Sequence, residues 1–175
     1  MFMINPLLNK QHLRQYLLYG LAAAVVYIIP YIIFLIRNDY ENFYLLFVGS
    51  GLFMLAIFIY TLKLIRQPYD KKRTLSMIFA GHFATITGVL IAAFLVITIL
   101  SLFFPHLFTT TYADKIVKDL PPAMRSGKPS GVLFPILFIT TLGNFGVGSF
   151  ISLITAYAGK LNQTKDEPVS LETRI

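Results

Sequence analysis

The chain of 175 residues contains no cysteine. This absence excludes disulfide scaffolding, metal sites built from thiolates, and the thiol–disulfide chemistry of four-span quinone-linked enzymes. Charge is also scarce, since 13% of the residues are charged, whereas an ordinary soluble domain carries about 25%. Because 56% of the residues are hydrophobic, we expect the chain to be solvated by lipid.

Acidic and basic side chains are absent from the interiors of the long apolar runs. Ionisable groups inside a bilayer mark ion and proton pathways, so their absence weighs against a proton-coupled transporter. Small four-span multidrug exporters, for example, rely on a carboxylate in their first helix. The corresponding run here offers only Gly, Ala, Val, Ile, Pro and Tyr at that position.

Four apolar runs are long enough to cross a membrane as helices, which takes about 17–25 residues each. The first run is too long for the apolar region of a signal peptide, which has about 7–15 residues. The third and fourth exceed the minimum and are expected to tilt or project beyond the bilayer. We therefore expect an all-α membrane protein, an antiparallel bundle of four transmembrane helices in one domain (1–160) with spans near 16–36, 43–62, 75–104 and 132–159.

The net charge of +7 is distributed between the apolar runs. Ten Lys and Arg residues fall on one side of the predicted bundle and five on the other, and short loops rich in Lys and Arg stay in the cytoplasm. The loop "KLIRQPYDKKR" decides the orientation because it directly abuts the second and third runs. We interpret this charge as topology and not as nucleic-acid binding. Both termini, including a flexible polar tail at 161–175, are expected in the cytoplasm.

The two outer connections differ in length. "RNDYEN" is short enough that the first two spans must form an antiparallel hairpin. The other connection, residues 105–131, carries apolar residues every four positions, at Tyr112, Ile116 and Leu120. This spacing predicts one short interfacial helix between the third and fourth spans, capped by the threonines at 109–111.

The stretch "TTLGNFGVGSF", residues 140–150, has the glycine density of a phosphate-binding loop. Such a loop needs a strand before the glycines and a helix that opens after them, but here the apolar run continues through them. Small residues instead form one stripe on each of the last two spans, and we expect the two helices to pack along these stripes or to offer them to a second copy. The stripes consist of Gly81, Ala84, Gly88 and Ala92 on the third span and Gly148, Ser152, Ala156 and Gly159 on the fourth.

Five polar residues at membrane depth are candidates for chemistry or ligand binding: His82, Asn144, Ser149, Tyr27 and Tyr31. Asn144 lies off the main stripe, and local unwinding around it is the alternative to a continuous fourth helix. The two tyrosines fit either a packing helix or a groove for a small ligand or lipid.

His82 fits a neutral imidazole that is hydrogen-bonded inside the bundle, or a role in proton handling or ligand binding. Ser149 falls at a similar depth, as a serine–histidine dyad would require, but neither an oxyanion site nor water access is visible in the sequence. A bis-histidine haem would need a second histidine at the depth of His82, where neither His12 nor His106 lies. We predict no catalytic, cofactor or metal site.

The layout resembles a family of small uncharacterised four-span bacterial membrane proteins common in Bacteroidota. The likeness lies in "YGLAAA" at the start of the first span, basic "KLIRQPYDKKR" after the second, an amphipathic outer segment, and "GSFISLITAYAGK" at the end of the fourth. It covers most of the chain. The resemblance implies the bacterial inner membrane but carries no activity and no residue roles.

Two functions fit these features. The first is a non-enzymatic membrane protein, an accessory or assembly subunit or a homo-oligomer, that acts through helix contacts with the bilayer, with other membrane proteins or with itself. The second is a small transporter or channel for a neutral or lipid-like substrate, with a path lined by uncharged polar groups. A continuous polar cavity would favour the second and a closed bundle the first.

Overall fold

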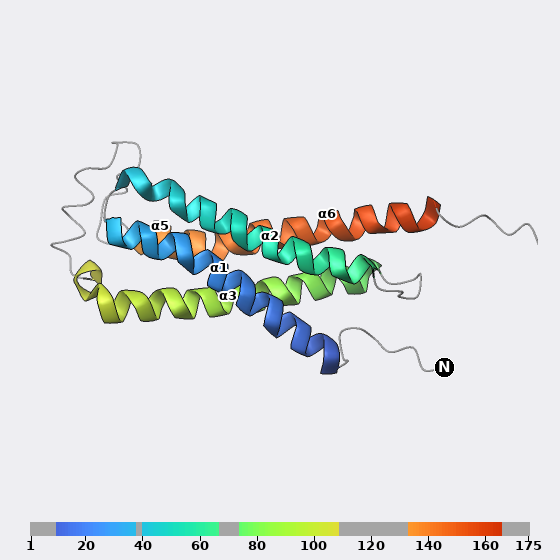
Figure 1. Ribbon diagram of the computed structural model, residues 1–175, viewed down its shortest axis with the longest axis horizontal. Helices are drawn as coiled ribbons and strands as arrows, with labels where there is room; N and C mark the ends of the chain where they lie inside the picture. Colours follow the sequence, from blue (N-terminus) through green and yellow to red (C-terminus); the bar gives the residue numbers. More distant parts are fainter. Residues whose placement is uncertain (1–9, 38–39, 67–73, 109–132, 166–175) are drawn as a thin grey trace, which may run out of the picture.

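The computed structural model of the protein describes residues 10–37, 40–66, 74–108 and 133–165 (Figure 1). Four long helical segments cover them, and no strand occurs in these ranges. The predicted all-α class with four helices of transmembrane length is confirmed. The elements are α1 (Lys10–Arg37), η1 (Tyr40–Phe43), α2 (Tyr44–Arg66), α3 (Thr74–Phe103), η2 (Pro105–Phe108), α5 (Leu133–Phe138), η4 (Ile139–Gly143) and α6 (Asn144–Lys165).

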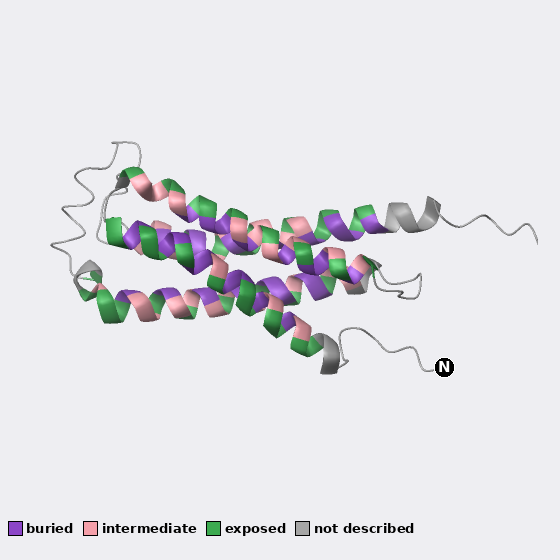
Figure 2. Cartoon of the chain, viewed as in Figure 1, coloured by how far each residue is buried: buried purple, intermediate pink, exposed green. Residues whose placement is uncertain are grey.

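The membrane-length stretches run over Leu13–Arg37, Glu41–Arg66, Met77–Phe103 and Leu133–Gly159. Each contains 25 to 27 residues, which is enough to cross a hydrocarbon core of about 30 Å. Large apolar side chains stay exposed along the outward faces, as the green segments in Figure 2 show. By helix length and composition, the chain is therefore a multi-pass membrane protein.

The four long helices form a bundle in which α1 and α6 each contact both α2 and α3. α2 also touches α3. In Figure 1, α1 crosses α3 obliquely and its first turns diverge from the other helices.

Contact pairs give the direction of neighbouring helices. Tyr27 of α1 lies beside Gly49 of α2, and Phe34 of α1 lies edge-on to Phe43, the η1 residue directly before α2, with ring centroids 5.9 Å apart. The residue numbers rise along one helix as they fall along the other, so these two helices run in opposite directions. Gly148 beside Thr85 and Ser152 beside Gly81 give the same relation between α3 and α6.

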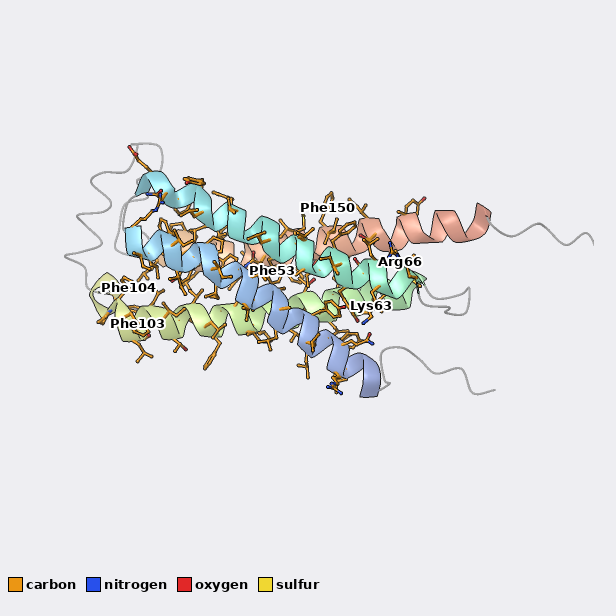
Figure 3. The ribbon with its side chains drawn as sticks, viewed as in Figure 1. Phe53, Lys63, Arg66, Phe103, Phe104 and Phe150 are labelled. Atoms are coloured by element: carbon orange, nitrogen blue, oxygen red, sulfur yellow. The ribbon has the colours of Figure 1, made fainter. Side chains whose placement is uncertain are left out.

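The centre of the bundle is filled by the Phe53 ring of α2, which is completely buried and lies between the other helices in Figure 3. A Cβ added at Gly88 of α3 would lie 2.9 Å from this ring, and one added at Gly148 of α6 would lie 3.2 Å from it. Helix association in lipid depends on such close van der Waals contact, because lipid tails are as apolar as the side chains. The two glycines therefore make room for Phe53.

The fourth span is one helical segment interrupted by a wide turn. Residues Ile139–Gly143 form a π-helix between α5 and α6, so the glycine-rich stretch is helical throughout and follows directly on the helical residues Leu133–Phe138. The predicted alternative of unwinding at Asn144 is replaced by this single π turn. π turns inside α-helices occur frequently at functional sites.

The last helix extends beyond its predicted end. α6 continues to Lys165, five residues into the segment predicted as a loose tail. The sequence "LNQTK" contains no glycine or proline to end the helix. The predicted interfacial helix, with Tyr112, Ile116 and Leu120, lies outside the described residues, and so do residues 166–175. Of the outer connection at 105–131, the structure describes the short η2 turn.

Candidate functional site

Most of the buried serine and threonine hydroxyl groups in the described spans bond to their own helix. Thr85 Oγ1 donates to the Gly81 carbonyl at 2.8 Å, Ser152 Oγ to the Gly148 carbonyl at 2.7 Å, and Thr155 Oγ1 to the Ile151 carbonyl at 2.6 Å. Donation to the carbonyl four residues earlier is a common arrangement for Ser and Thr in membrane helices. These residues are satisfied locally and serve as small packing residues.

Tyr27 makes a different kind of contact, because it joins two helical segments. Its Oη lies 2.8 Å from Thr140 Oγ1 in the π-helix, and both side chains are completely buried. The single hydroxyl hydrogen of Thr140 is donated to the Ile136 carbonyl, with an O–O distance of 2.7 Å. Tyr27 must therefore be the donor and Thr140 the acceptor.

Asn144 is bonded to the same turn. Its backbone N–H bonds to the carbonyls of Ile139 and Thr141, and so does not close the regular α-helical turn onto Thr140. The Asn144 side chain compensates, since its Nδ2 donates to the Thr140 carbonyl at 3.1 Å. The π-helix thus connects Tyr27, Thr140 and Asn144 in one buried polar group, which we call the Tyr27 cluster.

Three polar atoms around this cluster have no hydrogen-bond partner in the protein: Tyr31 Oη, Ser50 Oγ and Asn144 Oδ1. The Tyr31 ring is stacked near Tyr27, with centroids 6.3 Å apart. Ser50 follows Gly49, where an added Cβ would lie 3.0 Å from the Tyr27 ring. An unsatisfied buried polar group costs about 1–3 kcal/mol, so these atoms are the most unusual feature of the bundle interior.

The Tyr27 cluster lies well inside the membrane. Tyr27 is 10 residues from the end of its span at Arg37, and Asn144 is 11 residues from the end at Leu133. At 1.5 Å per residue, both lie about 15 Å deep, near the middle of a hydrocarbon core of about 30 Å.

The structure does not join His82 and Ser149. His82 Nδ1 donates to the Ile78 carbonyl of its own helix at 2.8 Å, since a carbonyl oxygen can only accept. Ser149 Oγ has no hydrogen-bond partner in the protein. A serine–histidine dyad is therefore not formed. Within the described ranges, no group of three or more His, Asp or Glu side chains has the arrangement of a metal site.

Asn144 was predicted to lie off the packing face, but it is completely buried. It lies four residues before Gly148, so successive helical turns bring both onto the same face. Thr140 and Ser50 were not among the predicted candidates. Thr140 is one turn before Asn144, and Ser50 lies between two glycines in the "GSG" of the second span. Both positions could have been recognised in the sequence as polar residues beside closely packed helices.

The predicted packing stripes have three different partners. Gly81 and Gly148 lie in the α3–α6 contact, beside Ser152 and Thr85. Ala84 and Gly88 instead lie against α1, where an added Cβ at Gly20 would meet the Ala84 carbonyl and the Gly88 nitrogen. Gly159 lies against Ile65 of α2, while Ala92 and Ala156 are buried. The α3 stripe differs from the prediction because it contacts α1 and α2 as well as α6.

Comparison with known proteins adds no relative: no family model, no curated protein and no solved structure matches the chain. The fold and the site define the class as an all-α multi-pass membrane protein with a buried polar group at a π-helix.

The donor assignment leads to an asymmetric mutational prediction. Thr140→Val leaves the Tyr27 hydroxyl buried without an acceptor and should cost about 1–3 kcal/mol. Tyr27→Phe leaves Thr140 bonded to Ile136 and should cost only about 0.6 kcal/mol, the average for side-chain hydrogen bonds in membrane proteins. Thermal unfolding in detergent measures both, with Tyr157→Phe on the exposed face as the control. A larger loss for Tyr27→Phe than for Thr140→Val would contradict the assigned direction.

Proposed function

We propose that the protein is a non-enzymatic integral membrane protein that acts through contacts of its outer helix faces with other membrane proteins or with a second copy. The observation that supports this function is the filled centre of the bundle. Phe53 has no exposed surface, and Gly88 and Gly148 leave no room for even one more carbon beside its ring. The outward faces, in contrast, carry large apolar residues such as Phe94, which is 70% exposed.

We also propose a location and a topology: the protein lies in the bacterial inner membrane with both termini in the cytoplasm. At one end of the bundle, Lys63 lies over the Tyr19 ring at 5.5 Å, and Arg66 follows one turn later on α2 (Figure 3). Amphipathic rings settle at either membrane–water interface, and the two basic side chains favour the cytoplasmic one.

A topology measurement tests this orientation. The chain has no cysteine of its own, so Ser76→Cys and Ser126→Cys each supply one thiol. We expect an impermeant thiol reagent added outside intact cells to label only the Ser126→Cys protein, because the basic loops hold the other side in the cytoplasm. Labelling of the Ser76→Cys protein from outside would reverse the orientation.

Native purification tests the proposed function itself. Extracted in mild detergent from its own membranes, the protein should migrate as a complex of fixed stoichiometry, containing either a second copy or another membrane protein. A photo-crosslinker at Phe94, which is exposed, should trap the partner, whereas one at completely buried Val96 serves as the control. A monomer with equal crosslinking from both positions would overturn the proposal.

The second candidate, a transporter or channel for a neutral substrate, is favoured by unpartnered polar atoms buried within the spans, such as Ser50 Oγ and Asn144 Oδ1. Such groups are unusual in lipid and often mark a substrate path. Proteoliposomes distinguish the two functions: a channel would speed the swelling of vesicles in glycerol or urea, and Asn144→Leu would reduce that rate. Vesicles that swell no faster than protein-free controls would eliminate this candidate for those solutes.

A further inference from the structure

The hydrogen-bond inventory of the Tyr27 cluster is unbalanced. Asn144 uses one amide hydrogen of Nδ2 to reach the Thr140 carbonyl, but its Oδ1 accepts nothing. Tyr27 donates its hydroxyl hydrogen to Thr140, and the lone pairs of its oxygen remain available to accept a hydrogen bond. Tyr31 Oη and Ser50 Oγ use neither donor nor acceptor within the protein.

Depth and burial prevent bulk solvent from supplying these bonds. Asn144 and Tyr31 have no exposed surface, and Ser50 has 6%. The three residues come from different helices, α6, α1 and α2, and the contacts of Tyr27 with Tyr31, Gly49 and Thr140 bring those helices together. Tyr31, Ser50 and Asn144 therefore belong to the three helical segments that meet at Tyr27.

The chemistry of these atoms defines what would fit among them. An amide oxygen needs a donor, while two free hydroxyl groups each offer a donor and acceptors. The interiors of the spans contain no Asp, Glu, Lys or Arg, so the occupant is neutral. It must also be small, because the neighbouring Phe53 layer is filled.

We infer that internal water is bound beside the π-helix, held by Asn144 Oδ1 together with the hydroxyl groups of Tyr31 and Ser50. A buried water typically makes two to four hydrogen bonds to otherwise unsatisfied polar groups, which this set supplies. Waters also commonly satisfy backbone groups where a membrane helix departs from regular geometry. The π turn and the unpartnered side chains thus belong to a single hydration site near mid-membrane.

Radiolytic hydroxyl-radical footprinting tests this site in the whole protein in detergent. X-rays split water where it is bound, so a side chain beside internal water is oxidised even when no solvent reaches it. Tyr31 and Phe53 are matched because both are completely buried aromatic residues, but only Tyr31 lies at the proposed water. We expect Tyr31 to be oxidised several-fold faster than Phe53.

Variants locate the effect. Asn144→Leu removes the amide oxygen and should reduce the oxidation of Tyr31 towards that of Phe53, whereas Ser149→Ala, outside the site, should leave it unchanged. If Asn144→Leu opens the bundle, the oxidation of Phe53 will also rise. In that case the smaller substitution Ser50→Ala is used in place of Asn144→Leu. Equal oxidation of Tyr31 and Phe53 in the wild type would overturn the hydration site. So would a Tyr31 rate that neither Asn144→Leu nor Ser50→Ala alters while Phe53 stays protected.

Discussion

Replacing Gly148 with leucine is expected to force α3 and α6 apart. An added Cβ alone would lie 2.5 Å from Thr85 Cγ2 and 2.8 Å from Thr85 Oγ1. Thr85 is held in place by its bond to the Gly81 carbonyl, so it cannot turn aside without losing that bond. Behind Thr85, the Phe53 ring closes the remaining space at 3.2 Å.

The expected loss for Gly148→Leu is at the upper end of the range for overpacked cores, about 1–3 kcal/mol and occasionally more. Gly146→Leu is the matched control: it lies two residues away on the same helix, and a Cβ added there meets no atom within 4 Å. Thermal unfolding of both variants in detergent measures the difference. Equal losses would mean that residues 144–150 do not pack as described.

Gly143 gives an intermediate case. The nearest atoms that a Cβ added there would meet are those of Ile139, at 3.5 Å, and the Phe138 carbonyl oxygen, at 3.9 Å, which are ordinary contact distances. Gly143→Leu should therefore fall between the two other variants. If this glycine region bound a nucleotide, ATP or NAD would instead raise the thermal midpoint of the wild type by mass action.

The four spans could be predicted from the sequence because a membrane restricts the alternatives so strongly. A backbone in lipid must satisfy its own hydrogen bonds, and long apolar runs do so only as helices. Composition and run length therefore determined the α class, the number of helices and their approximate ends. Ends shifted by a few residues where the helix continued into polar sequence, as at Lys63 and Arg66 of α2.

The partners of each face could not be predicted in the same way. A small-residue stripe shows that some helix approaches closely but does not identify that helix. Gly88 was assigned to the contact with α6 yet meets Phe53 of α2 and Gly20 of α1, because the crossing point depends on how all four helices share the volume around Phe53. No local pattern encodes that arrangement.

The π-helix was also beyond sequence reasoning. Residues 139–143 contain good membrane-helix formers, and nothing in "ITTLG" requires a wide turn. The turn is stabilised by distant residues: Thr140 accepts from Tyr27, which is 113 positions away in the chain.

Replacing Gly20 with alanine should be more damaging than the addition of one methyl group suggests. The added Cβ would lie 2.9 Å from the Gly88 backbone nitrogen and 3.0 Å from the Ala84 carbonyl oxygen. Backbone atoms in the middle of a helix cannot rotate away as a side chain can, so α1 and α3 must separate. Overpacking of this kind costs about 1–3 kcal/mol. Gly51→Ala, whose Cβ meets nothing within 4 Å, should be neutral or slightly stabilising because alanine favours helix.

A double-mutant cycle then distinguishes a shared crossing from two separate defects. Gly88→Ala alone should also destabilise, since its Cβ would approach the Gly20 carbonyl at 3.1 Å and the Phe53 ring at 2.9 Å. Once Gly20→Ala has moved the helices apart, part of the room for the second methyl group already exists. The losses in the Gly20→Ala/Gly88→Ala protein should therefore fall short of the sum by about 0.5–3 kcal/mol, the range for residues in contact. Additive losses within error would show that the two glycines do not meet, and the oblique crossing of α1 over α3 would have to be abandoned.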